Sequence, residues 1–228
     1  MQEPLVLKQL EIGPMMNFVY IIGCAKTRQA AVVDPAWDVP LIRRTAREMD
    51  LELNRVLMTH SHPDHINGLP ELLETTNVRV CMHPLETEYM REMAAQFGVP
   101  VDFVNLTSAN YQPVSDGEEI ILGELRVRVL HTPGHTPGSV CFLVNDSLFS
   151  GDTLFINACG RVDFPGGDAA AMWFSLNRKL AALDDGTVLF PGHNYGDRHS
   201  STIGEQRRSN RYMRYASQQD FQRDMESD

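Results

Sequence analysis

Three histidines and one aspartate lie within six positions of the sequence, in the segment LMTHSHPDHINGL (57–69), directly after the apolar run VLM (56–58). Four polar side chains of these kinds in one loop would be costly to desolvate unless something engages them. A metal cluster would engage all four. The candidate ligands in this loop are His60, His62, Asp64 and His65.

Three more residues of the same types follow strand-like apolar runs further along the chain. His135 lies in HTPGHTPGS (131–139), Asp152 in LFSGDTLF (148–155) and His193 in FPGHNYG (190–196). Strand ends are places where a rigid sheet can direct several side chains at a common point. We therefore expect these residues to join the loop at 57–69 in one metal centre.

The residue types define the chemistry of such a centre. Imidazole nitrogen and carboxylate oxygen suit zinc, or iron and manganese, and the set contains no thiolate. Two ions a few ångströms apart would lower the pKa of a shared water toward ~7 and polarise an acyl oxygen, so that a bridging hydroxide acts as nucleophile. One ion could be held by His60, His62 and His135, and the other by Asp64, His65 and His193, with Asp152 bridging both.

Composition narrows the class of protein. The chain has 228 residues, of which 43% are hydrophobic, enough for one large globular domain. Its formal charge of −10 argues against nucleic acid as a partner. No apolar run is long enough to span a membrane, and the first residues have no signal-peptide pattern, so we expect a cytoplasmic protein. The four cysteines are far apart, without a CxxC pair.

The hydrophobic pattern predicts two strand-rich halves that carry helices, which favours an α/β fold with two packed sheets and helices outside. No linker divides the chain, so we expect one domain over 1–228 with a short helical C-terminal tail at about 203–219. The helix predicted at 84–97 has an apolar stripe of Leu85, Tyr89, Met93 and Phe97. A long helix is predicted at 168–183, and strands at 6–12, 18–23, 30–34, 55–59, 78–82, 118–122, 125–131, 139–144, 147–151 and 187–192.

Four motifs in order, THSHPDH (59–65), GHTPGS (134–139), GDTLF (151–155) and PGHNY (191–195), resemble those of the metallo-β-lactamase superfamily. The resemblance implies an αββα sandwich of two mixed β-sheets with a binuclear site at its open edge. It also implies the ligand assignment given above. A bridging aspartate at Asp152 is similar to that of glyoxalase II, the hydroxyacylglutathione hydrolase.

This resemblance implies a metal-dependent thioester hydrolase that holds two zinc ions, with iron or manganese as alternatives. Asp64 would anchor one ion and orient the attacking hydroxide. Glyoxalase II carries an added helical domain that helps to hold glutathione, whereas only residues 194–228 follow the last ligand here. We therefore expect the single-domain form. The resemblance implies a small acyl thioester as substrate, with glutathione, coenzyme A and a carrier protein all open as the thiol.

A second hypothesis is that the chain is a persulfide dioxygenase, because GRVDF (160–164) and HNYGDRHSSTIGEQRRSN (193–210) are similar to segments of that family. The resemblance implies a single non-haem iron on His60, His135 and Asp152. A lactonase and a non-catalytic metal-binding scaffold are further alternatives. Arg161 and Tyr195 are candidate substrate-binding residues, each with an ordinary structural role as its alternative. Whether the chain forms a homo-oligomer stays open.

Overall fold

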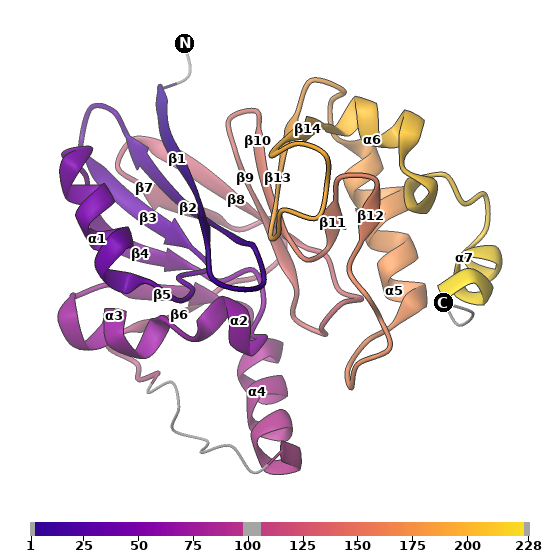
Figure 1. Cartoon of the computed structure of the whole chain (residues 1–228), viewed down its shortest axis with the longest axis horizontal. Helices are drawn as coiled ribbons and strands as arrows, with labels where there is room; N and C mark the ends of the chain where they lie inside the picture. The colour runs from indigo at the N-terminus through magenta and orange to yellow at the C-terminus, as the bar shows by residue number, and fades with distance from the viewer. Residues whose placement is uncertain (1–2, 98–105, 226–228) are drawn as a thin grey trace.

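Two six-stranded β-sheets pack face to face in the computed structural model, which describes residues 3–97 and 106–225 (Figure 1). The first sheet has the order β1-β2-β3-β4-β5-β6, antiparallel from β1 to β3 and parallel from β3 to β6. Its strands are β1 (Leu5–Ile12), β2 (Asn17–Cys24), β3 (Gln29–Val33), β4 (Glu52–Leu57), β5 (Arg79–Met82) and β6 (Tyr111–Pro113).

The second sheet has the order β14-β13-β10-β9-β8-β7, in which only β10 and β13 are parallel. Its strands are β7 (Glu119–Leu122), β8 (Leu125–His131), β9 (Val140–Val144), β10 (Ser147–Gly151), β13 (Val188–Pro191) and β14 (Ser201–Thr202). A small hairpin of β11 (Leu154–Phe155) and β12 (Ala158–Cys159) follows β10.

Helices cover the outer faces of both sheets, which makes the αββα sandwich that the sequence predicted (Figure 1). On the first sheet these are α1 (Val39–Glu48), α2 (Pro63–Ile66), α3 (Leu69–Thr75) and α4 (Pro84–Phe97). On the second they are α5 (Ala169–Phe174), α6 (Ile203–Ser209) and α7 (Gln218–Met225).

Strand β2 shows why the sheets stack in this way. All eight of its residues are buried, because alternate side chains point to opposite faces of the sheet. Phe18, Tyr20 and Ile22 pack into the core between the sheets. Val19 and Ile21 pack into the core under α1 and α3. Burial on both faces gives a continuous apolar run instead of an alternating one.

The predicted helix at 168–183 changes its hydrogen bonding along its length. It is α-helical to Phe174, π-helical over Ser175–Lys179 and 3₁₀ over Leu180–Ala182. Its buried apolar residues Met172, Leu176 and Leu180 recur every four positions, whereas an α-helix completes a turn every 3.6 residues. The wider π turn keeps Leu176 and Leu180 on the buried face.

Two other sequence predictions differ from the structure. The tail expected at 203–219 is interrupted after α6 at Asn210, whose extended backbone lets its side chain donate to the carbonyls of Phe155 and Ala158. On α4 the predicted stripe differs at its first residue, since Leu85 is 38% exposed while its neighbour Glu86 is fully buried. Tyr89, one turn further along the stripe, is buried as predicted. The predicted Phe97 lies among residues whose side chains are not described.

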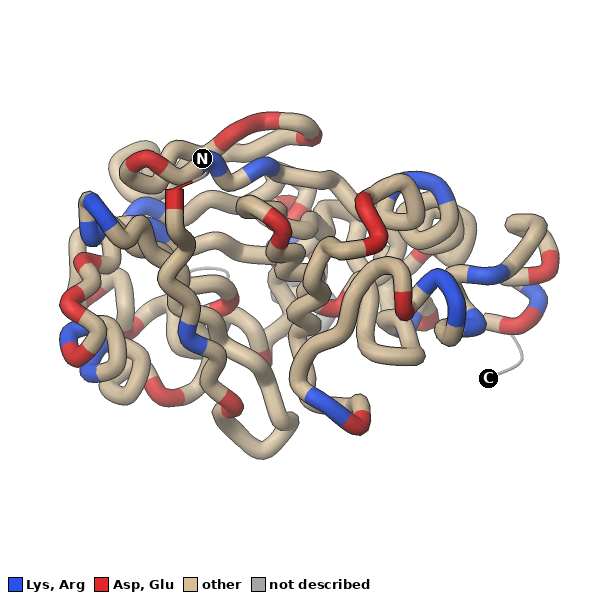
Figure 2. The backbone as a smooth tube through the Cα atoms, turned by 90° about the horizontal axis from the view of Figure 1, so that it is seen from above, with Lys and Arg blue, Asp and Glu red and all other residues tan. Residues whose placement is uncertain are grey.

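Basic and acidic positions are mixed over the molecule (Figure 2). Among the described residues, no helix combines the length and apolar character that crossing a membrane requires.

Candidate metal centre

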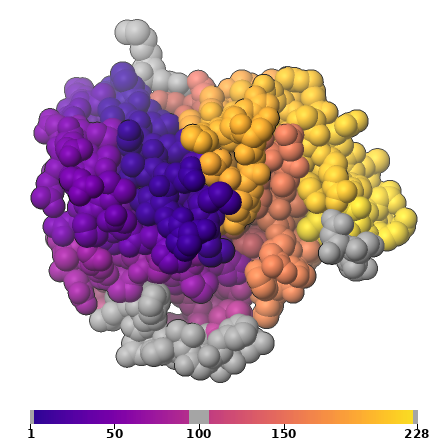
Figure 3. All heavy atoms as spheres, viewed as in Figure 1, coloured from indigo at the N-terminus to yellow at the C-terminus, as the bar shows by residue number. Residues whose placement is uncertain are grey.

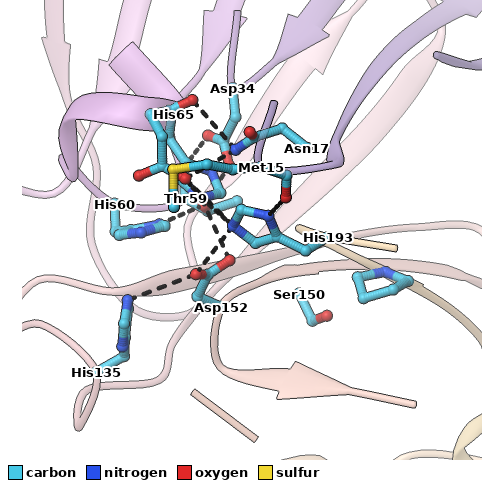
Figure 4. A network of polar contacts seen from close by, with 12 residues as sticks. Met15, Asn17, Asp34, Thr59, His60, His65, His135, Ser150, Asp152 and His193 are labelled. Atoms are coloured by element: carbon cyan, nitrogen blue, oxygen red, sulfur yellow. Dashed lines mark hydrogen bonds and ion pairs between the residues drawn. The ribbon is translucent and has the colours of Figure 1, made fainter. Parts of the chain in front are cut away.

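The seven predicted ligands lie at one edge of the sandwich, where strands of both sheets end. Figure 4 labels His60, His65, His135, Asp152 and His193 among them. The first sheet contributes the four predicted ligands of the THSHPDH motif, which lie between the end of β4 and the end of α2. The second sheet contributes His135 after β8, Asp152 after β10 and His193 after β13.

Asp64, His65 and His193 form one group of ligand atoms. The Nε2 atoms of His65 and His193 are 3.1 Å apart, and they lie 3.4 and 3.3 Å from Asp64 Oδ2. Both rings are buried. Such an approach of two ring nitrogens and a carboxylate oxygen is the arrangement expected around a cation.

His60, His62 and His135 form a second group, with one ligand atom of each lying within 4.8 Å of the others. Asp152 lies between the two groups. Its Oδ1 is 3.3 Å from His65 Nε2, and its Oδ2 is 3.4 Å from His193 Nε2 and 3.6 Å from His135 Nε2. One carboxylate therefore faces ligands of both groups.

Two buried nitrogens test whether these residues suit a metal. Nε2 of His60 and Nε2 of His135 have no hydrogen-bond partner among the described residues. Buried polar atoms are normally paired, because an unpaired one keeps its full desolvation cost. A cation would satisfy both nitrogens, and the imidazole and carboxylate donors match those that zinc, iron and manganese accept. The residues present fit such an ion.

The other ring nitrogen of four histidines is held by a neighbouring oxygen. A donating Nδ1 leaves Nε2 free as the ligand atom and fixes the orientation of the ring. The Nδ1 partners are Thr59 Oγ1 for His60 (3.0 Å), Asp34 Oδ2 for His65 (3.0 Å), the Arg161 carbonyl for His135 (2.7 Å) and the Met15 carbonyl for His193 (2.9 Å).

His62 is held the opposite way round. Its Nε2 lies 3.0 Å from the hydroxyl of Tyr89 on α4. Its Nδ1 is therefore the nitrogen left for a metal. This difference allows two histidines that are only two positions apart, His60 and His62, to belong to the same group.

Sequence reasoning missed two residues that support the ligands (Figure 4). Asp34 Oδ1 accepts from the Thr59 amide at 2.7 Å, while its Oδ2 faces the Thr59 hydroxyl and His65. Asn17 is buried and donates to Asp64 Oδ2 at 2.9 Å. Asp34 carried a usable signal, because it also ends an apolar strand run, AAVV. Asn17 at the start of β2 carried none.

The two groups differ in protonation when no metal is bound. Burial, with a smaller contribution from the neighbouring His135, lowers the pKa of His62 to about 4. Burial also acts to lower the pKa of His193, but its hydrogen bonds with Asp152 and Asp64 prevail and raise this pKa to about 9. At neutral pH His193 therefore carries a proton and His62 does not.

Metal binding is expected to displace the His193 proton, because a metal ligand must be a neutral imidazole. Near pH 7.5 the wild type should release more protons on metal binding than the H193A variant, and the His193 proton is part of the difference. The difference should shrink as the pH rises through about 9, where His193 is already neutral. Calorimetric titration with zinc in buffers of different ionisation enthalpy measures it, and equal release by both proteins would contradict it.

Gly151, directly before Asp152, has a φ of +50°. A Cβ atom there would lie 2.3 Å from Thr59 Oγ1. G151A should lower the free energy of unfolding of the metal-free protein by about 2–4 kcal/mol, through left-handed strain and overpacking. G186A is the matched control, because its Cβ would meet nothing within 4 Å, and we expect it to stay within about 0.5 kcal/mol. Urea unfolding measures both, and equal effects would refute the prediction.

The two candidate substrate-binding residues lie in different surroundings. Tyr195 is 50% exposed, and its ring stacks on His193 with centroids 4.6 Å apart. The Arg161 guanidinium is exposed, pairs with Asp163 and lies over the Phe164 ring. The contact of Arg161 with the ligands is made by its carbonyl, through His135.

Residues 16–18, at the start of β2, form backbone hydrogen bonds with residues 192–194, the loop that carries His193. The amide of Phe18 donates to the Gly192 carbonyl at 2.8 Å, and that of Asn194 to the Met16 carbonyl at 2.9 Å. In Figure 3 the indigo N-terminal segment accordingly meets the orange segment that follows β13. These contacts fix the Met15 carbonyl that holds His193.

The fold and this centre define a class of protein. The family model described as the Metallo-beta-lactamase superfamily matches residues 12–193, so the chain belongs to that superfamily, as its motifs predicted. The αββα sandwich is the metallo-beta-lactamase fold. We therefore place the chain among the enzymes of this superfamily of metal-dependent hydrolases.

The relatives that this chain resembles are described with different activities. The chain is 32% identical to a probable polyketide biosynthesis zinc-dependent hydrolase, PksB of Bacillus subtilis, over 86% of this chain and 81% of the relative. It is 36% identical to a probable hydroxyacylglutathione hydrolase, glo2 of Schizosaccharomyces pombe (84% and 70%). It is 30% identical to the human mitochondrial persulfide dioxygenase ETHE1 (91% and 75%). Among solved structures, ETHE1 from Myxococcus xanthus superposes with a TM-score of 0.82 at 34% identity, covering 97% of this chain and 90% of that one.

Proposed function

We propose that this chain hydrolyses a small acyl thioester at a centre of two metal ions. The proposal rests mainly on two groups of three residues that could hold a metal ion, with Asp152 facing members of both groups. One group would suffice for a mononuclear enzyme. The likeness to hydroxyacylglutathione hydrolases and to PksB supports hydrolysis, and the latter's description as zinc-dependent supports zinc as the metal.

The residues of the chain would divide the work as follows. His60, His62 and His135 would hold one ion, Asp64, His65 and His193 the other, and Asp152 would contact both. When bound, two such cations supply a water of lowered pKa and stabilise negative charge on the acyl oxygen. Asp64, oriented by Asn17, would accept a hydrogen bond from the attacking water and so direct it at the acyl carbon. The thiolate leaves without a strong general acid.

Exposed apolar side chains near the ligands would form the substrate-binding surface. Met15, Trp37 and Phe164 are each exposed by more than a third. The Phe164 ring lies 5.7 Å from that of His62, and Tyr195 stacks on His193 on the other side of the centre. Such surface suits the apolar part of an acyl thioester. The Tyr195 hydroxyl would donate to the substrate, and Arg161 would bind an anionic group only by exchanging its partner Asp163.

Persulfide dioxygenation is the second candidate, favoured by the likeness to the two ETHE1 proteins. The ligands that it would use, His60, His135 and Asp152, lie together here as well. In this reading His65 and His193 would have no metal to hold. The pairing of these two histidines with Asp64 and Asp152 supports the hydrolase instead.

One comparison of activities tests the proposal. Zinc-loaded protein is assayed for thiol release from acyl-glutathione and acyl-coenzyme A, and iron-loaded protein for oxygen uptake on glutathione persulfide. Thiol release that depends on Asp152, without oxygen uptake, is the expected result. Oxygen uptake without thioester cleavage would overturn the proposal.

A further inference from the structure

A buried carboxylate outside the ligand set links the two loops that carry His60, His62 and His135. Glu86 lies in the first turn of α4 and is fully buried. Its Oε2 accepts from the Ser61 amide at 2.7 Å and from the Ser61 hydroxyl at 2.5 Å. Ser61 is the residue between His60 and His62.

The other oxygen of the same carboxylate reaches the loop of the third histidine. Glu86 Oε1 accepts from the Thr136 hydroxyl at 2.6 Å and from the Gly138 amide at 2.8 Å. Thr136 directly follows His135. A Cβ atom at Gly138 would lie 2.8 Å from the Glu86 backbone nitrogen, so the loop approaches α4 as closely as only glycine allows.

We infer that Glu86 is a positioning residue, whose carboxylate sets the separation of the His60–His62 loop and the His135 loop for one metal ion. The inference rests on the proposed ligand role of these three histidines. Each oxygen accepts one backbone N–H, a group that can only donate. Tyr89, one turn further along α4, contacts His62 directly. Helix α4 therefore supports this ligand group at two points.

The donor pattern makes glutamine a sharp test. Glutamine has the shape of glutamate, but its NH₂ group would face the amide of either Ser61 or Gly138. One loop would then lose its anchor, and hydrogen bonds to charged acceptors are the stronger kind. Loss of an outer partner of metal ligands typically costs 10–100-fold in metal affinity. The four donors to the Glu86 carboxylate lie within residues 60–62 and 135–138. We therefore expect only the site of His60, His62 and His135 to weaken.

The test measures the affinity for zinc, by competition with a chromophoric chelator, in two backgrounds. H193A leaves the His60–His62–His135 group intact, and H135A leaves the Asp64–His65–His193 group intact. We expect E86Q to weaken zinc binding about 10–100-fold in the H193A background and less than about threefold in the H135A background. General destabilisation would weaken both alike. S61A removes one of the four donors, the Ser61 hydroxyl, and should weaken zinc binding in the H193A background by a smaller factor. It replaces E86Q in the test if E86Q does not fold.

Q206E is the matched control. Gln206 is also fully buried, and its amide bonds Asn157, Ser201 and Asn210, none of which is a ligand. Q206E should lower the unfolding midpoint without changing zinc affinity in either background. Equal weakening of both backgrounds by E86Q, or of neither by both E86Q and S61A, would overturn the inference. Wild type that binds no zinc would instead refute the proposed centre itself.

Discussion

D152A is expected to bind at most one metal ion per chain and to lose about a thousandfold or more in kcat/KM for thioester hydrolysis. The reason is the place of this carboxylate. Its oxygens lie 3.3–3.6 Å from Nε2 of His65, His193 and His135, so both ligand groups lose their shared negative charge. Metal is counted by mass spectrometry on protein dialysed after zinc loading, and activity by thiol release.

D146A is the control for this substitution. Asp146 is an exposed aspartate that directly precedes β10, whereas Asp152 directly follows it, so the removal of Asp146 should leave metal content and rate unchanged. D152N adds a second comparison, because it keeps the size of the side chain and loses the charge. Two ions and an unaltered rate in D152A would contradict the bridging role of Asp152.

H193A is expected to lose one of two metal ions and to reduce hydrolysis by about 100-fold or more, since a single remaining ion cannot supply the two-metal arrangement. The same substitution distinguishes the two proposed reactions. In an oxygenase with iron on His60, His135 and Asp152, H60A would abolish activity while H193A would spare most of it. In a binuclear hydrolase both substitutions should be severe.

H199A is the matched histidine substitution. His199 is exposed and lies six residues after His193, its ring packs against Phe18, and it belongs to none of the ligand groups. It should bind two ions and keep its rate. H193A with normal hydrolysis and metal content would show that the Asp64–His65–His193 group holds no functional ion.

The αββα layers could be predicted from the sequence because most of the longer strands are short apolar runs bounded by turn residues. The short strands β6 (YQP) and β14 (ST) carry no such run and were not predicted. The ligand loops could be predicted for a related reason, since His60, Asp152 and His193 each follow such a run. The break at Asn210 could not, because it depends on carbonyls of the β11–β12 hairpin, some fifty positions away in the chain. Contacts between residues so far apart in the chain produce no periodic pattern in the sequence.

Glu86 shows the same limit at the site. A glutamate in the first turn of a helix is ordinarily solvated and favoured by the helix dipole. Here the helix packs against two ligand loops at that turn, and the carboxylate becomes the acceptor for four donors. The apolar stripe that starts at Leu85 includes the buried Tyr89 but gives no sign of a buried Glu86, because a stripe reports hydrophobic spacing and not which polar groups surround the helix.

Anomalous X-ray diffraction at the zinc edge, recorded from crystals of zinc-loaded protein, locates the bound ions. We expect two peaks, one among His60, His62 and His135 and one among Asp64, His65 and His193, with Asp152 in contact with both. A single peak bound by His60, His135 and Asp152, or no peak among these side chains, would contradict this expectation.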